Sequence, residues 1–208
     1  MKKKINIIII VLFIVLISLG TYKINRYEKY FIKENDLQLV YFCQSIIKNQ
    51  DLFNEYEYTG ITVEEIVQLS TNYDTEIDSY MELDNRVKYF EEDAYDSSEY
   101  IAVLLDCHYY VNKYLLNGVY YDRTKVFPDK IEITEEYKRM YKNMSELNEI
   151  YYTFLMSDII DAEHYTETGT FRFGEKTNFN YWSDIVTELN GMTEEYLTNN
   201  HISNGILN

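Results

Sequence analysis

The residue types best suited to catalysis or metal binding are scarce in this chain of 208 residues, which has three His and two Cys. His108 recurs with Leu104 and Val111 at helical spacing, so its imidazole is expected on the inward, apolar face of a helix. A lone histidine on such a face is more often a hydrogen-bonded core group than a catalyst or a ligand. We therefore keep His108 as a candidate site residue and interpret it first as part of the core.

Asp161 and His164 form the second candidate site. Their spacing of three places a carboxylate and an imidazole on adjacent turns of one helix. Helical di-metal centres need this arrangement twice, with Glu in the motif and further Glu residues from two other helices. Neither His108 nor His201 follows an acidic residue at that spacing. The sequence therefore predicts no metal site and no cofactor.

The acidic stretch Asp74, Glu76 and Asp78 resembles the start of a calcium-binding loop. An EF-hand also needs Gly at the sixth position and Glu at the twelfth, and this stretch has neither. The segment fits a helix whose apolar face passes through Ile77 and Tyr80, and on a helix the three acids splay apart. We interpret them as part of a solvent-exposed face.

Cys43 and Cys107 lie in different predicted helices. In an oxidising compartment they could form one disulfide. The alternative is two buried thiols, because free cysteine is among the side chains most often found in protein cores. The chain has no Gly-rich phosphate loop, nucleophile elbow or zinc-protease motif. The sequence therefore assigns no catalytic residue.

The elements that must position these residues are helices. Apolar side chains recur at steps of three, four or seven, which is typical of amphipathic helices. Thr62 and Glu65 have the spacing of a capping box, and Gly118 is a stop signal. Gly191 is expected to end or bend the last helix. Helices are expected over residues 26–54, 63 to 89 or 92, 97–116, 134–164 and 178–190.

Such helices bury their apolar faces best against one another. The predicted fold is therefore mainly α, with a four- to five-helix bundle-like domain. At most minor β elements are expected, near residues 119–127 and near 170–173, where Phe171 and Phe173 alternate with polar residues.

The N-terminal region carries a membrane signal. Lys2, Lys3 and Lys4 precede a nearly unbroken apolar run from Ile5 to Leu19. At about 1.5 Å per residue this run is shorter than the ~30 Å of hydrocarbon, but it reaches that length if it continues to Ile24. Basic residues stay cytoplasmic, so the rest of the chain is expected outside. We predict a membrane anchor within residues 1–25, in contact with lipid over residues 5–24, and an acidic extracytoplasmic domain over 26–208.

Two features of this N-terminal region stay open. The anchor could continue into the first amphipathic helix, since neither Gly nor Pro lies between Gly20 and Gly60. Alternatively, Ser18 and Gly20 offer the small residues of a signal cleavage site, and the domain would then be secreted. Both alternatives export the domain.

The net charge of −16 opposes binding to nucleic acid. Together with the absence of catalytic motifs, it favours a non-enzymatic helical protein that acts outside the membrane by protein binding or scaffolding. The alternatives are an exported enzyme with a site built from scattered Tyr, Asp and Glu, and a small-ligand sensor that works with a membrane partner. A cleft with convergent carboxylates and strongly shifted pKa values would favour the enzyme.

Overall fold

The computed structural model describes residues 2–59, 61–90, 98–116, 130–131, 135–171, 173 and 179–202. This described part is mainly helical, as the sequence predicts. The chain divides into two compact units, Met1–Leu37 and Gln38–Asn208. The division therefore falls after Leu37, whereas the sequence places the end of the anchor near residue 25.

Helix α1 extends from Lys2 to Thr59, so the apolar run continues into the first amphipathic helix without a break, which the sequence left open. It belongs to the first unit up to Leu37 and to the second unit from Gln38. Among the described residues, no helix combines the length and the apolar character that a membrane span requires.

Strand β1 (Ile61–Thr62) and helix α2 (Val63–Phe90) follow. The predicted capping box is confirmed. The Glu65 backbone N–H donates to Thr62 Oγ1 at 3.2 Å, and the Thr62 N–H donates to the Glu65 carboxylate. Two helix-terminal donors are thereby satisfied. Strand β1 pairs antiparallel with β2 (Lys130–Ile131), with Ile61 opposite Ile131.

Helix α3 (Ser98–Tyr110) continues into a π-helical turn, η1 (Val111–Leu115). The first turn of α3 is capped by another helix, because the N–H groups of Glu99 and Tyr100 both donate to Asn190 Oδ1 at 3.1 Å. A side chain from α7 therefore supplies the acceptor that a local N-cap residue usually provides.

The expected single helix over residues 134–164 is wrong near its C-terminal end. Helix α5 (Glu135–Phe154) passes into a π-helical turn, η2 (Leu155–Ile159), and the chain becomes extended at Ile160. Ile160 forms an isolated antiparallel bridge with Phe173. Helix α6 (Ala162–Thr168) then starts anew and ends at Gly169, which has a positive φ of 66°.

Helix α7 (Phe179–Asn199) runs through Gly191, so the expected end of the helix there is wrong. Burial on both sides of the glycine explains this. Leu189, Thr193 and Tyr196 are all buried, and the Thr193 hydroxyl lies 2.6 Å from that of Tyr151 on α5. Tertiary packing therefore outweighs the roughly 1 kcal/mol by which glycine disfavours a helix.

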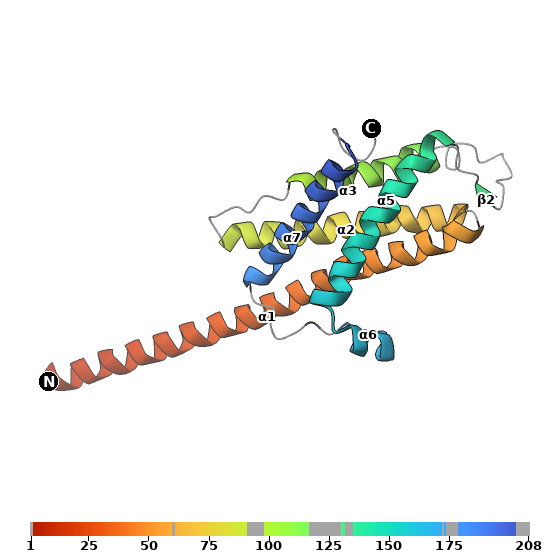
Figure 1. Cartoon of the computed structure of the whole chain (residues 1–208). Coiled ribbons are helices and arrows are strands. Elements are labelled where there is room, and N and C mark those ends of the chain that lie inside the picture. Colours follow the sequence, from red (N-terminus) through yellow and green to blue (C-terminus); the bar gives the residue numbers. More distant parts are fainter. Residues whose placement is uncertain are drawn as a thin grey trace, which may run out of the picture. The chain divides into compact units, whose positions relative to one another are not determined.

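In the second unit, α2, α3, α5 and α7 gather with the C-terminal part of α1 (Figure 1). Aromatic rings occupy the centre. The ring centroids of Phe42 and Trp182 are 5.1 Å apart, and that of Tyr100 lies 5.6 Å from that of Tyr80 and 5.2 Å from that of Tyr151. The bundle-like prediction is confirmed. The predicted β element at 119–127 lies outside the described residues, and near 170–173 the described bridge is that of Phe173.

Candidate functional site

The most unusual side chain in the second unit is Glu76, which is only 1% exposed. The interpretation of Asp74, Glu76 and Asp78 as one solvent-exposed face is therefore wrong for Glu76, although its two acidic neighbours are exposed. Glu76 is three residues after Tyr73 and four before Tyr80, so the α-helical period places all three on one face. The buried face of α2 consists of Ile66, Leu69, Tyr73, Glu76, Tyr80 and Leu83.

One oxygen of the Glu76 carboxyl is satisfied and the other is not. The Tyr100 hydroxyl donates to Glu76 Oε1 at 2.7 Å. Tyr100 is itself held by its backbone bond to Asn190 and by the rings of Tyr80 and Tyr151. Glu76 Oε2 is buried and has no hydrogen-bond partner among the described residues. A buried polar atom in this state carries a large desolvation penalty if the group is charged.

A small cavity lies beside this carboxyl, between α2, α3 and α5. Its volume is about 10 Å³, roughly what one water molecule requires and far too small for a substrate. The lining residues are Tyr73, Glu76, Val103, Leu104, Cys107, Met144, Leu147, Asn148 and Tyr151.

Burial raises the pKa of Glu76 to about 8, and the hydrogen bond from Tyr100 lowers it by a smaller amount. The carboxyl is therefore mostly protonated at neutral pH. Burial also raises the pKa values of Tyr73, Tyr100 and Tyr151 well above the ordinary value for tyrosine, so these hydroxyls stay neutral.

Cys43 and Cys107 are both free thiols buried in this core. Burial raises the pKa of each thiol, and a hydrogen bond with the Tyr73 hydroxyl opposes this at Cys107. A thiol held neutral in apolar surroundings is a poor nucleophile and a poor metal ligand. The structure thus presents the buried-thiol alternative, with no bond between the two sulfurs.

His108 lies at the boundary of the core and not within it, since 29% of its side chain is exposed. Its Nε2 lies 2.7 Å from Asp74 Oδ1 on α2 and 2.7 Å from Asn112 Nδ2 in η1. Ser70 donates its hydroxyl hydrogen bond to Asn112 Oδ1 at 3.0 Å. The serine thus bonds to the asparagine and not to the imidazole. This cluster therefore links α2 to η1 without forming a nucleophile–base pair.

Asp161 and His164 form a helix cap. Asp161 Oδ1 accepts a hydrogen bond from the His164 backbone N–H at 3.0 Å, and Asp161 is the N-cap of α6. The imidazole Nε2 lies 3.1 Å from Thr170 Oγ1. No group of three or more His, Cys, Asp or Glu side chains in the described part of the chain could hold a metal ion. The three-residue spacing is thus explained by the geometry of an N-cap.

An open groove of about 550 Å³ lies between the C-terminal part of α5, η2 and α7. Its floor is apolar and half-buried, and its rim carries the exposed carboxylates of Glu149 and Asp158. The sequence has no Lys or Arg between Asn143 and Phe171 or within α7. The lining residues are Glu149, Ile150, Thr153, Phe154, Ser157, Asp158 and Met192.

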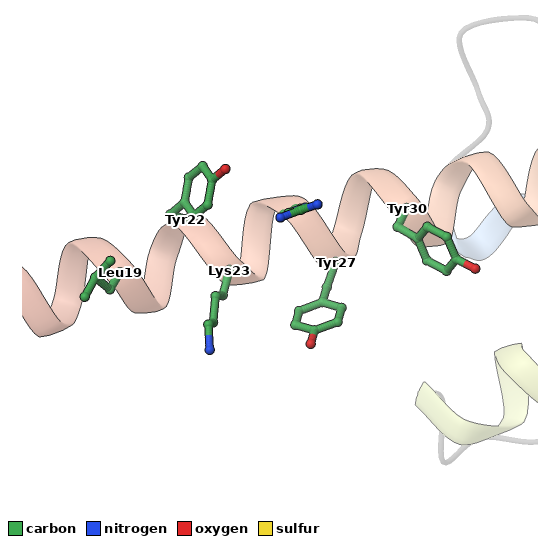
Figure 2. Close-up of a pocket in the computed structure, with 6 residues that line it drawn as sticks. Leu19, Tyr22, Lys23, Tyr27 and Tyr30 are labelled. Atoms are coloured by element: carbon green, nitrogen blue, oxygen red, sulfur yellow. The ribbon is translucent and has the colours of Figure 1, made fainter.

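Among its described residues, the first unit exposes apolar and basic side chains instead of acidic ones. The large apolar side chains from Phe13 to Leu19 are between 48% and 66% exposed. Tyrosines and basic residues follow them on the same helix. Lys23 and Tyr27 point to one side of the helix and Tyr22 to the other (Figure 2). A pocket on this part of the helix is lined by Leu19, Tyr22, Lys23, Arg26, Tyr27 and Tyr30.

Comparison with protein-family models, with curated proteins and with solved structures gives no match to this chain.

Proposed function

We propose that this chain is a single-pass membrane protein whose acidic helical domain lies on the extracytoplasmic side and acts by binding another protein. The observation that carries the proposal is the exposed apolar surface from Phe13 to Leu19. Apolar surface left in water is unfavourable by roughly 25 cal/mol per Å², and a contiguous patch of this kind calls for a cover.

Lipid is the cover that best fits the sequence around this patch. Ile5 to Val11 extend the apolar run towards the N-terminus, and three lysines precede them. On the other side, Tyr22, Tyr27 and Tyr30 alternate with Lys23 and Arg26. Tyrosine and long basic side chains are enriched where a membrane helix leaves the hydrocarbon. The basic residues before the run support a cytoplasmic N-terminal side.

The groove between α5, η2 and α7 supports the binding role. Its apolar floor of Ile150, Phe154 and Met192 and its acidic rim of Glu149 and Asp158 suit a basic amphipathic segment of a partner protein. The shifted pKa of Glu76 gives little support to the alternative of an exported enzyme. The strongly shifted carboxyl lies in the core beside a cavity of about 10 Å³ and not in a cleft.

The topology can be tested by labelling with a membrane-impermeant maleimide. Thr187→Cys places a reactive thiol on an exposed position of α7, whereas the native Cys43 and Cys107 are buried. A cysteine in a tag added before Met1 reports on which side of the membrane the N-terminus lies. In intact cells we expect labelling of Thr187→Cys and no labelling of the tag, which should react only after permeabilisation.

Three outcomes would contradict the proposal. Labelling of Thr187→Cys only after lysis would place the domain inside. If a carbonate wash released the full-length chain from the membranes, residues 1–25 would not be a membrane anchor. Recovery of a shortened chain in the medium would instead support the secreted alternative with cleavage near Gly20.

A further inference from the structure

Among the described residues, no cation compensates the charge of the Glu76 carboxyl. Burial and the bond from Tyr100 account for its pKa, and the described Lys and Arg residues do not contribute. On α7, the helix that supports Tyr100, the acids Asp184, Glu188, Glu194 and Glu195 are all exposed. The described titratable groups that act on Glu76 from α1, α2, α3 and α5 include Cys43, Tyr73, Tyr100, Cys107 and Tyr151.

All of these neighbours stay neutral across the physiological range. Burial raises the pKa of each thiol and of each phenol above its ordinary value. Glu76 is therefore the group of this cluster whose charge changes between acidic and mildly alkaline solution. A carboxylate formed here would have one hydrogen bond and an unsatisfied second oxygen. It would need water to be stabilised.

The cavity shows where that water would enter. It adjoins Glu76 and is bounded by α2, α3 and α5, and its volume of about 10 Å³ leaves no room for a hydration shell. Hydrating a carboxylate at this position requires the three helices to separate. The cost of that separation is avoided as long as the carboxyl keeps its proton.

We propose that Glu76 is a proton-binding site in the core of the helical domain, and that release of its proton opens the bundle between α2, α3 and α5. The proposal goes beyond partner binding and does not depend on the topology proposed above. A neutral glutamine of the same shape would fill this position without any response to pH. A glutamate makes the stability of the domain sensitive to pH.

The direction follows from linkage. The pKa of Glu76 is about 8 in the folded chain and has an ordinary value of 4.5 when the side chain is exposed. The folded state therefore binds the proton more tightly than the unfolded state. Stability from this site is complete below pH 4.5 and is lost progressively as the pH rises to about 8. This is the reverse of the usual behaviour of a salt-bridged carboxylate.

The buried thiols report on the opening. We would measure the labelling rates of Cys43 and Cys107 by a maleimide, from pH 5 to pH 9, on the full chain in detergent or lipid discs. The matched variant is Glu76→Gln, because dividing the two rates at each pH cancels the intrinsic change in thiol reactivity. The ratio of wild type to Glu76→Gln should rise on the order of 10²-fold between pH 6 and pH 9.

Parallel pH profiles for the wild-type chain and Glu76→Gln would overturn the proposal. If Glu76→Gln does not fold, Glu76→Met is the second neutral reference, with a side chain of similar length. A rise that both neutral variants share would assign the opening to another group and would equally overturn it. Because the samples are purified, a failed topology experiment and a failed titration cannot be confused.

Discussion

The two units of this chain place side chains in surroundings that suit them poorly, but in opposite ways. The first unit exposes apolar side chains from Phe13 to Leu19, and the second unit buries the carboxyl of Glu76 in an aromatic core. Exposed apolar surface is unfavourable in water, and a buried carboxyl is unfavourable when it is charged. The first can be relieved by an apolar cover, such as the hydrocarbon of a membrane. The second can be relieved by a bound proton.

The comparison shows that burial alone does not say what a residue does. The apolar side chains from Phe13 to Leu19 are informative because no described residue of the first unit covers them. Glu76 is informative because no described cation compensates its charge. The predictions below alter one side of the comparison at a time.

The largest effect is expected from charges placed in the apolar run. Phe13→Asp combined with Ile17→Asp puts two carboxylates on one face of the helix. Each charge near the centre of a membrane helix is unfavourable by about 2.5–3.5 kcal/mol, so the pair should cost roughly 5–7 kcal/mol of insertion. We expect the chain to leave the carbonate-washed membrane pellet, while Phe13→Leu with Ile17→Leu stays in it. Retention of the charged variant would show that lipid does not cover this surface.

A smaller effect is expected from Tyr100→Phe, which removes the hydrogen bond to Glu76 Oε1. A buried acceptor left unsatisfied costs about 1–3 kcal/mol, to be measured as the free energy of unfolding in urea. That hydrogen bond lowers the pKa of Glu76, so its removal should extend the loss of stability to a higher pH and increase the total loss. An unchanged pH profile would show that the two side chains are not coupled. Tyr151→Phe is a control, because its hydroxyl bonds to Thr193.

Asn190→Ala should destabilise the domain by about 1–2 kcal/mol. The side chain accepts hydrogen bonds from the N–H groups of Glu99 and Tyr100, which lie in the first turn of α3. Asn190→Asp keeps the acceptor but loses the hydrogen bond that Asn190 Nδ2 donates to Glu194 Oε1 at 3.1 Å, and it places two carboxylates together, so it should recover only part of the loss in thermal unfolding. A melting temperature of Asn190→Ala equal to that of the wild-type chain would mean that this cap contributes little to holding Tyr100 against Glu76.

The smallest effect is expected at Asp74, only two residues from Glu76. Its side chain is 60% exposed and pairs with a half-exposed His108, and a solvated pair of this kind is worth about 0–1 kcal/mol. At each pH from 5 to 9, Asp74→Asn should therefore have nearly the same urea midpoint as the wild-type chain. A large loss would show that the His108 cluster, and not Glu76, controls the response to pH.

Much of the helical architecture is predictable because its signals are local. The capping box at Thr62 and Glu65 and the continuity of α1 depend on nearby residues and on the absence of helix breakers. The passage of α7 through Gly191 is not predictable in this way. It depends on the packing of Thr193 against α5, which sequence spacing does not reveal.

The candidate site was missed for a related reason. Ile77 is apolar and lies one residue beyond Glu76, so a small rotation of α2 decides which of the two faces the core. Tertiary packing selects the face of Tyr73, Glu76 and Tyr80. Similarly, the three-residue spacing of Asp161 and His164 fits both a metal half-site and an N-cap. The break after η2 selects the cap.

The claim that the core keeps a proton at neutral pH is tested most directly by infrared titration of the full chain, with Glu76→Gln as the reference. We expect the wild-type minus Glu76→Gln spectrum to show the carbonyl band of a protonated carboxylic acid, which disappears with a midpoint near pH 8. A midpoint near 4.5, or no such band at neutral pH, would contradict the account.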